Sequence, residues 1–171
     1  MSARVLIAGI GNVFQGDDAF GVEVAQRLSA LKLPEGVEVK DFGIRGFDLA
    51  YALMEPWDLA ILVDAMQRGG APGTLYVVEP HEISASELAG IETHGMTPLR
   101  AIEMVKALGG EPPHMLVVGC EPGELGGDDG VMGFSSAVEH AIVEAINLVQ
   151  EKVTEFLAVP VGEALSEGAR T

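Results

Sequence analysis

Short apolar runs alternate with amphipathic segments along most of the chain, and this alternation restricts the possible folds more than any other feature of the sequence. The runs are typical of buried strands, and the segments between them place apolar residues at helical spacing. The pattern predicts strands over residues 4–8, 37–41, 58–63, 73–78 and 115–119, and helices over residues 19–31, 46–54, 98–108 and 135–157. Strands that alternate with helices pair mostly in parallel. We therefore expect an α/β fold of three layers, with helices on both faces of a twisted, mostly parallel five-stranded sheet.

The connection before the fourth expected strand is the exception to this parallel arrangement. It is too short to hold a helical crossover, so the fourth strand is free to run antiparallel. The chain has 171 residues, and domains average about 150 residues. We therefore expect one α/β domain over residues 1–157, followed by a flexible C-terminal tail over residues 158–171.

The charge balance excludes several kinds of partner. The chain has 10 Lys and Arg residues against 26 Asp and Glu residues, which gives a net charge of −16. Proteins that bind nucleic acid through its phosphates need clustered basic residues, and so do proteins that dock on anionic membranes. We expect no nucleic acid and no membrane as partner, and the acidic surface favours cations, metals among them.

The single cysteine and the lack of long apolar runs indicate a cytoplasmic protein. One cysteine allows no internal disulfide and no zinc site built from several thiolates. No apolar run approaches the roughly 18 residues that a membrane span needs. The first apolar run is also too short for the core of a signal peptide.

A glycine-rich turn after the first expected strand suggests a dinucleotide site, but the rest of that motif is missing. Gly9 and Gly11 have the required spacing, whereas the third small residue of the motif is replaced by Phe14. Asp17 and Asp18 occupy the start of the following helix, where a phosphate would need free amide groups and no negative charge. A nucleotide-binding enzyme therefore remains only an alternative.

Three polar side chains follow predicted strands or precede predicted helices, and they are the best candidates for chemistry. Asp18 precedes the first helix, Asp64 follows the third strand, and His94 precedes the helix at residues 98–108. Each has a local alternative. Asp17 or Asp18 could cap a helix, Asp64 could bind loop amides, and His94 could be an ordinary loop residue.

Taken together, the three residues indicate a metal site. The expected fold places the ends of the first and third strands side by side, and ligands of such sheets bind beyond the carboxyl ends of the strands. Two carboxylates and an imidazole suit Ni²⁺, Zn²⁺, Mn²⁺ or Cd²⁺, with water completing the coordination. A structural zinc site would need four protein ligands. Cys120 is a weaker candidate, because a nucleophilic cysteine needs a positioned base and a lone cysteine is more often a small buried residue.

The order of these motifs resembles that of the hydrogenase maturation proteases, over residues 4–157. The resemblance rests on four segments, which are Gly9-Ile10-Gly11-Asn12, Gly16 to Gly21, Val63-Asp64-Ala65 and Thr93-His94-Gly95-Met96. Residues 72–74 and 119–122 are also similar to the family. Each motif is weak alone, but the ordered set is fairly specific.

This resemblance implies an endopeptidase with a twisted five-stranded sheet. Such an enzyme removes a short C-terminal extension from the nickel-iron hydrogenase large-subunit precursor after nickel insertion. It also implies that Asp18, Asp64 and His94 bind the metal, with Asp18 and Asp64 as the catalytic carboxylates. The nickel is then carried by the substrate, and other divalent metals can occupy the site in vitro. A monomer is expected.

The sequence leaves two points open. Many members of the family carry Asp-Gly-Gly-Thr after the second strand, whereas this chain has Asp41 to Gly46 with Ile44 and Arg45 in the loop. We expect Arg45 to influence which precursor is recognised. The alternatives in function are a non-catalytic nickel-binding chaperone of hydrogenase assembly and a metal-dependent peptidase of general specificity.

Overall fold

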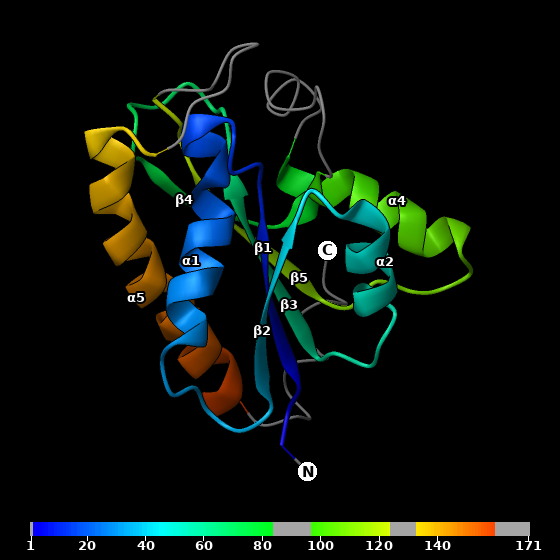
Figure 1. Ribbon diagram of the computed structural model, residues 1–171. Helices are drawn as coiled ribbons and strands as arrows, with labels where there is room; N and C mark the ends of the chain where they lie inside the picture. Colours follow the sequence, from blue (N-terminus) through cyan, green and yellow to red (C-terminus); the bar gives the residue numbers. More distant parts are fainter. Residues whose placement is uncertain (1, 84–96, 124–132, 160–171) are drawn as a thin grey trace.

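The computed structural model of the chain describes residues 2–83, 97–123 and 133–159 (Figure 1). Its elements follow one another in the order β1 (Val5–Ile10), η1 (Gly16–Ala19), α1 (Phe20–Ser29), β2 (Val37–Gly43), α2 (Gly46–Leu53), β3 (Leu59–Ala65), β4 (Leu75–Val78), η2 (Pro80–Glu82), α4 (Pro98–Ala107), β5 (Met115–Cys120) and α5 (Ser136–Ala158). Within the described ranges, no helix is both long and apolar enough to cross a membrane. The expected flexible tail falls almost entirely on residues outside these ranges.

One five-stranded sheet organises the fold, with the strands in the order β2-β1-β3-β5-β4. The pairs β1–β2, β1–β3 and β3–β5 are parallel, whereas β4 runs antiparallel to β5. The predicted α/β class is thus confirmed, including the single antiparallel strand. β2 and β4 form the two edges, so the carboxyl ends of β1, β3 and β5 meet in the middle of one rim.

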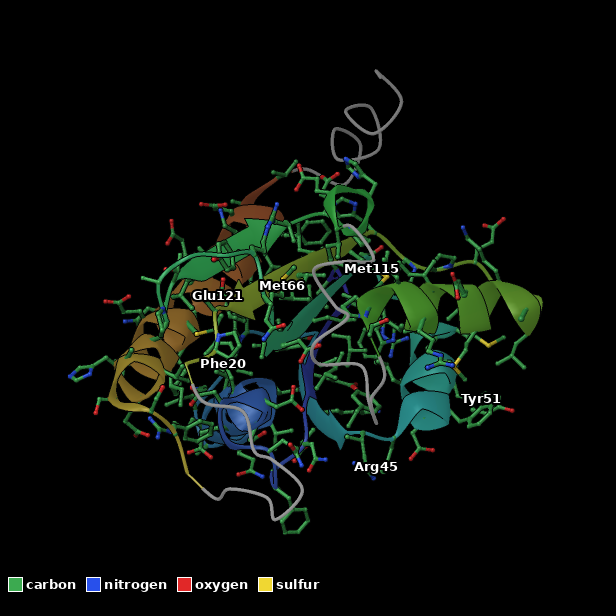
Figure 2. All side chains as sticks on the ribbon, turned by 90° about the horizontal axis from the view of Figure 1, so that it is seen from above. Phe20, Arg45, Tyr51, Met66, Met115 and Glu121 are labelled. Carbon is green, nitrogen blue, oxygen red and sulfur yellow. The ribbon has the colours of Figure 1, made fainter. Side chains whose placement is uncertain are left out.

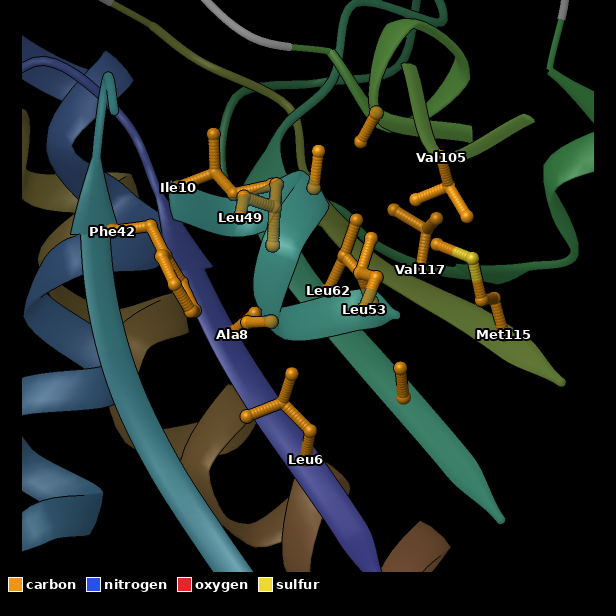
Figure 3. Packing of buried hydrophobic residues seen from close by; sticks show 14 of the residues in the cluster. Leu6, Ala8, Ile10, Phe42, Leu49, Leu53, Leu62, Val105, Met115 and Val117 are labelled. Atoms are coloured by element: carbon orange, nitrogen blue, oxygen red, sulfur yellow. The ribbon is translucent and has the colours of Figure 1, made fainter. Parts of the chain in front are cut away.

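Helices cover both faces of the sheet, as the alternation predicts. α1 and α5 lie on one face, and α2 and α4 lie on the other (Figure 1). Each face has its own apolar cluster. The cluster on the α2–α4 side includes Leu6, Leu62, Leu49, Leu53 and Val105 (Figure 3). On the α1–α5 side, residues of α1 and α5 pack on alternate positions of the central strands.

The central strands are buried on both faces, and their composition explains this. Every residue of β1 and β3 is buried, as expected for near-continuous apolar runs in a parallel sheet. β2 instead alternates between partly buried and exposed residues over its first half. α4 begins as predicted, because the side chain of Thr97 accepts a hydrogen bond from the amide of Arg100 at 3.1 Å and Pro98 occupies the first position.

The predicted helix at residues 19–31 differs from the observed one. A short 3-10 helix, η1, holds Asp17 and Asp18, and α1 starts only at Phe20. β3 also continues beyond its expected end, so Asp64 lies inside the strand rather than after it.

Gly21 determines how closely α1 approaches the sheet. A Cβ atom at this position would collide with the backbone oxygens of Val63 and Ile10. These oxygens lie at the carboxyl ends of β3 and β1, directly before Asp64 and the loop at Gly11. The first turn of α1 therefore rests on the strand ends with no side chain between them.

We predict that Gly21→Ala is severely destabilising, because the methyl group meets backbone atoms that cannot move aside. Overpacking of this kind costs about 3 kcal/mol, far more than alanine gains over glycine in a helix. Chemical denaturation measures the loss. Gln26→Ala, which places the same side chain on the exposed side of α1, should change stability by less than about 0.5 kcal/mol. An equally stable Gly21→Ala protein would contradict the close approach.

Candidate active site

Asp18 lies on η1, beyond the carboxyl end of β1, and is 8% exposed. Its Oδ2 atom accepts a hydrogen bond from the amide of Asn12 at 3.0 Å. The side chain of Asn12 in turn accepts from the amide of Phe14 at 2.9 Å, which shapes the loop between β1 and η1. Oδ1 of Asp18 is buried, and no group among the described residues hydrogen bonds to it.

Asp64 lies near the end of β3, with its side chain 4% exposed. Its Oδ1 atom accepts a hydrogen bond from the amide of Ala65 at 2.8 Å. Gly119 occupies the paired position on β5, so no side chain from β5 stands beside the carboxyl at that point. β1 and β3 are neighbours in the sheet, and the topology therefore brings Asp64 and Asp18 together as the sequence predicts.

Both carboxyl groups have raised pKa values, chiefly because they are buried. Burial raises the pKa of Asp18 to about 6, and the hydrogen bond from Asn12 opposes only part of this rise. Burial also raises the pKa of Asp64 well above its usual value, and the neighbouring charge of Asp18 raises it further. Ionising Asp64 beside an ionised Asp18 is therefore unfavourable, and a cation nearby would favour the ionised form of both groups.

The third predicted metal ligand, His94, lies outside the described residues. Across residues 2–83, 97–123 and 133–159, no three His, Cys, Asp or Glu side chains form a group that could hold a metal ion. The described part of the predicted site thus consists of Asp18 and Asp64. The unpartnered Oδ1 of Asp18 suits an incoming cation or water, because carboxylate oxygens are good ligands for divalent metals.

The glycines of the turn at Gly9 and Gly11 serve packing. A Cβ atom on Gly9 would collide with the backbone of Gly21 and the side chain of Ala25, and one on Gly11 would collide with the carbonyl oxygen of Asp18. The space that a dinucleotide motif reserves for pyrophosphate is filled here by the chain's own backbone. This packing disfavours the nucleotide-binding alternative.

Two further buried carboxylates, Asp17 and Glu121, lie at the same rim. Neither of them was identified from the sequence as part of the site. Asp17 is fully buried, and neither η1 nor α1 has a side-chain cap, so the structure does not support the alternative that Asp17 caps a helix. Glu121 directly follows β5 and is 4% exposed. The only sequence signal for Glu121 is an acid directly after a buried strand.

Glu121 fastens the connection that follows β3. Its Oε1 atom accepts hydrogen bonds from the amides of Arg68 and Gly70, at 3.0 and 2.7 Å, and from the hydroxyl of Tyr76 at 3.2 Å. In the view from above, Glu121 and Met66 lie near each other (Figure 2). The segment after Asp64 is thereby held against the end of β5.

Cys120 has none of the features of a nucleophile. It is 1% exposed and belongs to the apolar cluster beneath α1 and α5. Burial raises the pKa of its thiol to about 12, with further contributions from the charges of Asp17 and Glu121. A thiol of this kind is not ionised at neutral pH, so the interpretation of Cys120 as a small buried residue is favoured.

Arg45 is engaged within its own loop. Its guanidinium donates to the carbonyl oxygens of Asp41 and Phe42 and lies 3.9 Å from the carboxylate of Asp48. These contacts shape the turn between β2 and α2. The expectation that Arg45 influences the choice of precursor stays a prediction.

The same α/β fold is found among solved peptidases. The hydrogenase maturating endopeptidase HybD from Escherichia coli superposes with a TM-score of 0.70 at 27% identity, over 89% of this chain and 93% of that one. A hydrogenase 2 maturation peptidase from a Thaumarchaeota archaeon superposes with a TM-score of 0.64 at 32% identity, over 88% of this chain and 98% of that one. The fold is therefore that of this class of peptidases.

Sequence comparisons give the family. The model of the hydrogenase maturation protease family HycI matches residues 22–152. The hydrogenase expression/formation protein HupD of Rhodobacter capsulatus is 31% identical over 147 residues, which cover 84% of this chain and 70% of HupD. A provisionally assigned hydrogenase maturation protease of Methanocaldococcus jannaschii is 34% identical over 149 residues, covering 85% of this chain and 93% of the relative. This chain belongs to the hydrogenase maturation protease family.

We predict that Asp64→Asn stabilises the protein at neutral pH. The pKa of Asp64 is higher in the folded protein than in the unfolded chain. Below the pKa of the unfolded chain the carboxyl is protonated in both states and does not destabilise the fold. As the pH rises through the folded pKa, its ionisation destabilises the folded state. The variant keeps an oxygen for the amide of Ala65 and removes one of two interacting charges. Unfolding measured at several pH values should show little change near pH 4 and a gain of about 1–3 kcal/mol near pH 7. A constant difference across this range would contradict the coupling.

We also predict that Cys120 is inert in the native protein. Alkylation by iodoacetamide at pH 8, followed by mass spectrometry, should be at least about a hundredfold slower than in guanidinium-unfolded chain, because the thiolate is scarce and buried. Native labelling as fast as that of the unfolded chain would show that the thiol is accessible and ionised.

Proposed function

We propose that this chain is the endopeptidase that removes a short C-terminal extension from a nickel-iron hydrogenase large-subunit precursor, after nickel has been inserted. In this proposal the nickel belongs to the precursor. Asp18, Asp64 and His94 bind it when the precursor docks, so that cleavage depends on a loaded substrate. Asp18 and Asp64 are also the catalytic carboxylates.

The buried pair Asp18 and Asp64 is the observation that supports this proposal most directly. Two carboxyl groups with raised pKa values lie together at the rim where ligands of α/β sheets bind. One oxygen of the pair, Oδ1 of Asp18, is buried and has no hydrogen-bond partner among the described residues. Such an arrangement is costly without a cation, and a nickel ion supplies the missing positive charge.

The same pair accounts for the chemistry of cleavage. Binding of the substrate's nickel places the scissile peptide beside the carboxyl groups, which turns recognition into proximity. An ionised carboxylate takes a proton from water as the water oxygen attacks the peptide carbonyl carbon. The proton then passes to the amide nitrogen as the C–N bond breaks. Activation of that water by the metal is the other route that fits the same residues.

We expect the purified protein to shorten only the nickel-loaded precursor. Loaded and nickel-free precursor from one host are incubated with the protein, and the product masses are measured by mass spectrometry. Asp64→Asn should slow processing about a hundredfold or more, the contribution typical of a positioned proton-transfer group, while the variant remains folded. Asp58→Asn is the matched control, because Asp58 is exposed at the opposite end of the same strand, where it accepts a hydrogen bond from the amide of Arg4.

Each other outcome supports a different function. Full activity of a folded Asp64→Asn protein would remove this residue from the catalytic machinery. Nickel binding without cleavage of either precursor would identify a non-catalytic chaperone of hydrogenase assembly. Cleavage of unrelated peptides on addition of metal would identify a peptidase of general specificity.

A further inference from the structure

Asp17 is a fully buried carboxylate that the proposed chemistry does not use. It precedes Asp18 on η1, and three hydrogen bonds join it to residues outside the acidic pair. Oδ2 accepts hydrogen bonds from the amide of Gly123 at 2.7 Å and from the hydroxyl of Ser135 at 2.7 Å. Oδ1 accepts from the amide of Ser135 at 2.8 Å. Asp17 thus joins η1 to the residues just after β5 and just before α5.

The hydrogen bond from the hydroxyl of Ser135 to Asp17 replaces the capping hydrogen bond that a serine at this position usually makes. Ser135 is the N-cap residue of α5, a position where serine normally accepts a hydrogen bond from an amide of the first helical turn. No such bond is present here, and the hydroxyl donates to Asp17 instead. The start of α5 therefore lacks its side-chain cap, while the carboxylate of Asp17 gains a third donor among the described residues.

Tight packing accompanies these hydrogen bonds. A Cβ atom on Gly123 would lie 3.0 Å from the hydroxyl oxygen of Ser135, 3.2 Å from Cβ of Pro72 and 3.4 Å from Oδ2 of Asp17. The three short hydrogen bonds and this packing leave the carboxylate of Asp17 little freedom to rotate. Hydrogen bonds to an ionised carboxylate are also stronger than those between neutral groups.

The geometry of η1 transmits this restraint to the neighbouring residue. A 3-10 helix has three residues per turn, so successive side chains point about 120° apart. Fixing the direction of the Asp17 side chain fixes the rotation of the turn about its axis. The Asp18 side chain is then directed toward the amide of Asn12, with its other oxygen left for the site.

We propose that Asp17 is a positioning residue that orients Asp18 through its hydrogen bonds to Gly123 and Ser135. The effect of this orientation on catalysis rests on the function proposed above. The orientation of Asp18 by Asp17 does not depend on that function. Its direct reporter is the amide of Asn12, which donates to Oδ2 of Asp18 at 3.0 Å. The neighbouring amide of Gly11, which donates to the carbonyl of Gly43 at 3.0 Å, serves as an internal reference for the integrity of the strand ends.

Amide hydrogen exchange measured by NMR tests the proposal in the full chain. In Asp17→Asn, a side-chain amide replaces one acceptor oxygen and faces a donor, so at least one of the three bonds is lost. We expect the amide of Asn12 to exchange at least tenfold faster, while those of Gly11 and Ala65 exchange at their wild-type rates. Asp58→Asn, at the opposite end of the sheet, should leave all three unchanged.

Ser135→Ala provides a milder version of the same test. It removes only the hydroxyl, and both oxygens of Asp17 keep a backbone donor, so the variant is expected to fold. The amide of Asn12 should exchange about two- to fivefold faster. Should Asp17→Asn fail to fold, this variant decides the question.

Processing of nickel-loaded precursor supplies the functional measurement. Asp17→Asn should lower kcat/KM at least tenfold, because the folded variant misdirects a carboxyl group that, in the proposed function, both binds the nickel of the precursor and takes part in catalysis. Unchanged exchange of the Asn12 amide, or an equal acceleration at Gly11, would overturn the proposal and leave Asp17 with a structural role only. Failure of the wild-type protein to process any precursor would instead refute the proposed function, and the exchange rates would still decide the role of Asp17.

Discussion

The contact between the backbone of Gly21 and the carbonyl oxygens of Val63 and Ile10 is the constraint on which the site depends. It seats the first turn of α1 directly on the ends of β3 and β1. A single methyl group at this contact would separate the helix from the sheet, and with it Asp18 from Asp64. The acidic pair is therefore a product of backbone packing, and the side chains that carry the chemistry contribute little to their own placement.

The packing holds together groups that oppose each other. Asp18 and Asp64 both lose solvent on folding, and the charge of one raises the pKa of the other. Favourable interactions of the surrounding fold must offset this cost, since like charges in a buried site are strongly disfavoured. Apolar clusters on both faces of the sheet provide the rigid frame that keeps the pair from separating. A site of this kind is least stable when empty and ionised, which is a common condition of functional sites.

Periodicity and topology allowed much of this structure to be predicted from the sequence. The alternation of buried strands and amphipathic helices gave the layers, and the short connection before β4 gave its antiparallel direction. The neighbouring positions of β1 and β3 then brought Asp18 and Asp64 to one rim. These inferences succeed because they depend on local pattern and on general rules of chain connection.

The roles of Asp17 and Glu121 depend on tertiary contacts that no local pattern contains. The donors to Asp17 lie 106 and 118 residues further along the chain, so an aspartate before a helix looks like a cap until the fold is known. Glu121 likewise meets donors 45 to 53 residues away.

The edges of the sheet limit how a polypeptide can be recognised. β4 has four residues, and β2 exposes the charged side chains of Glu38 and Lys40 along its length. Short or charged edge strands are poor templates for the addition of another strand. The two edge strands therefore offer an extended polypeptide little backbone to pair with. In the proposed function, the precursor is then recognised through side chains and through the nickel that it carries, and the length of sequence that it presents matters far less.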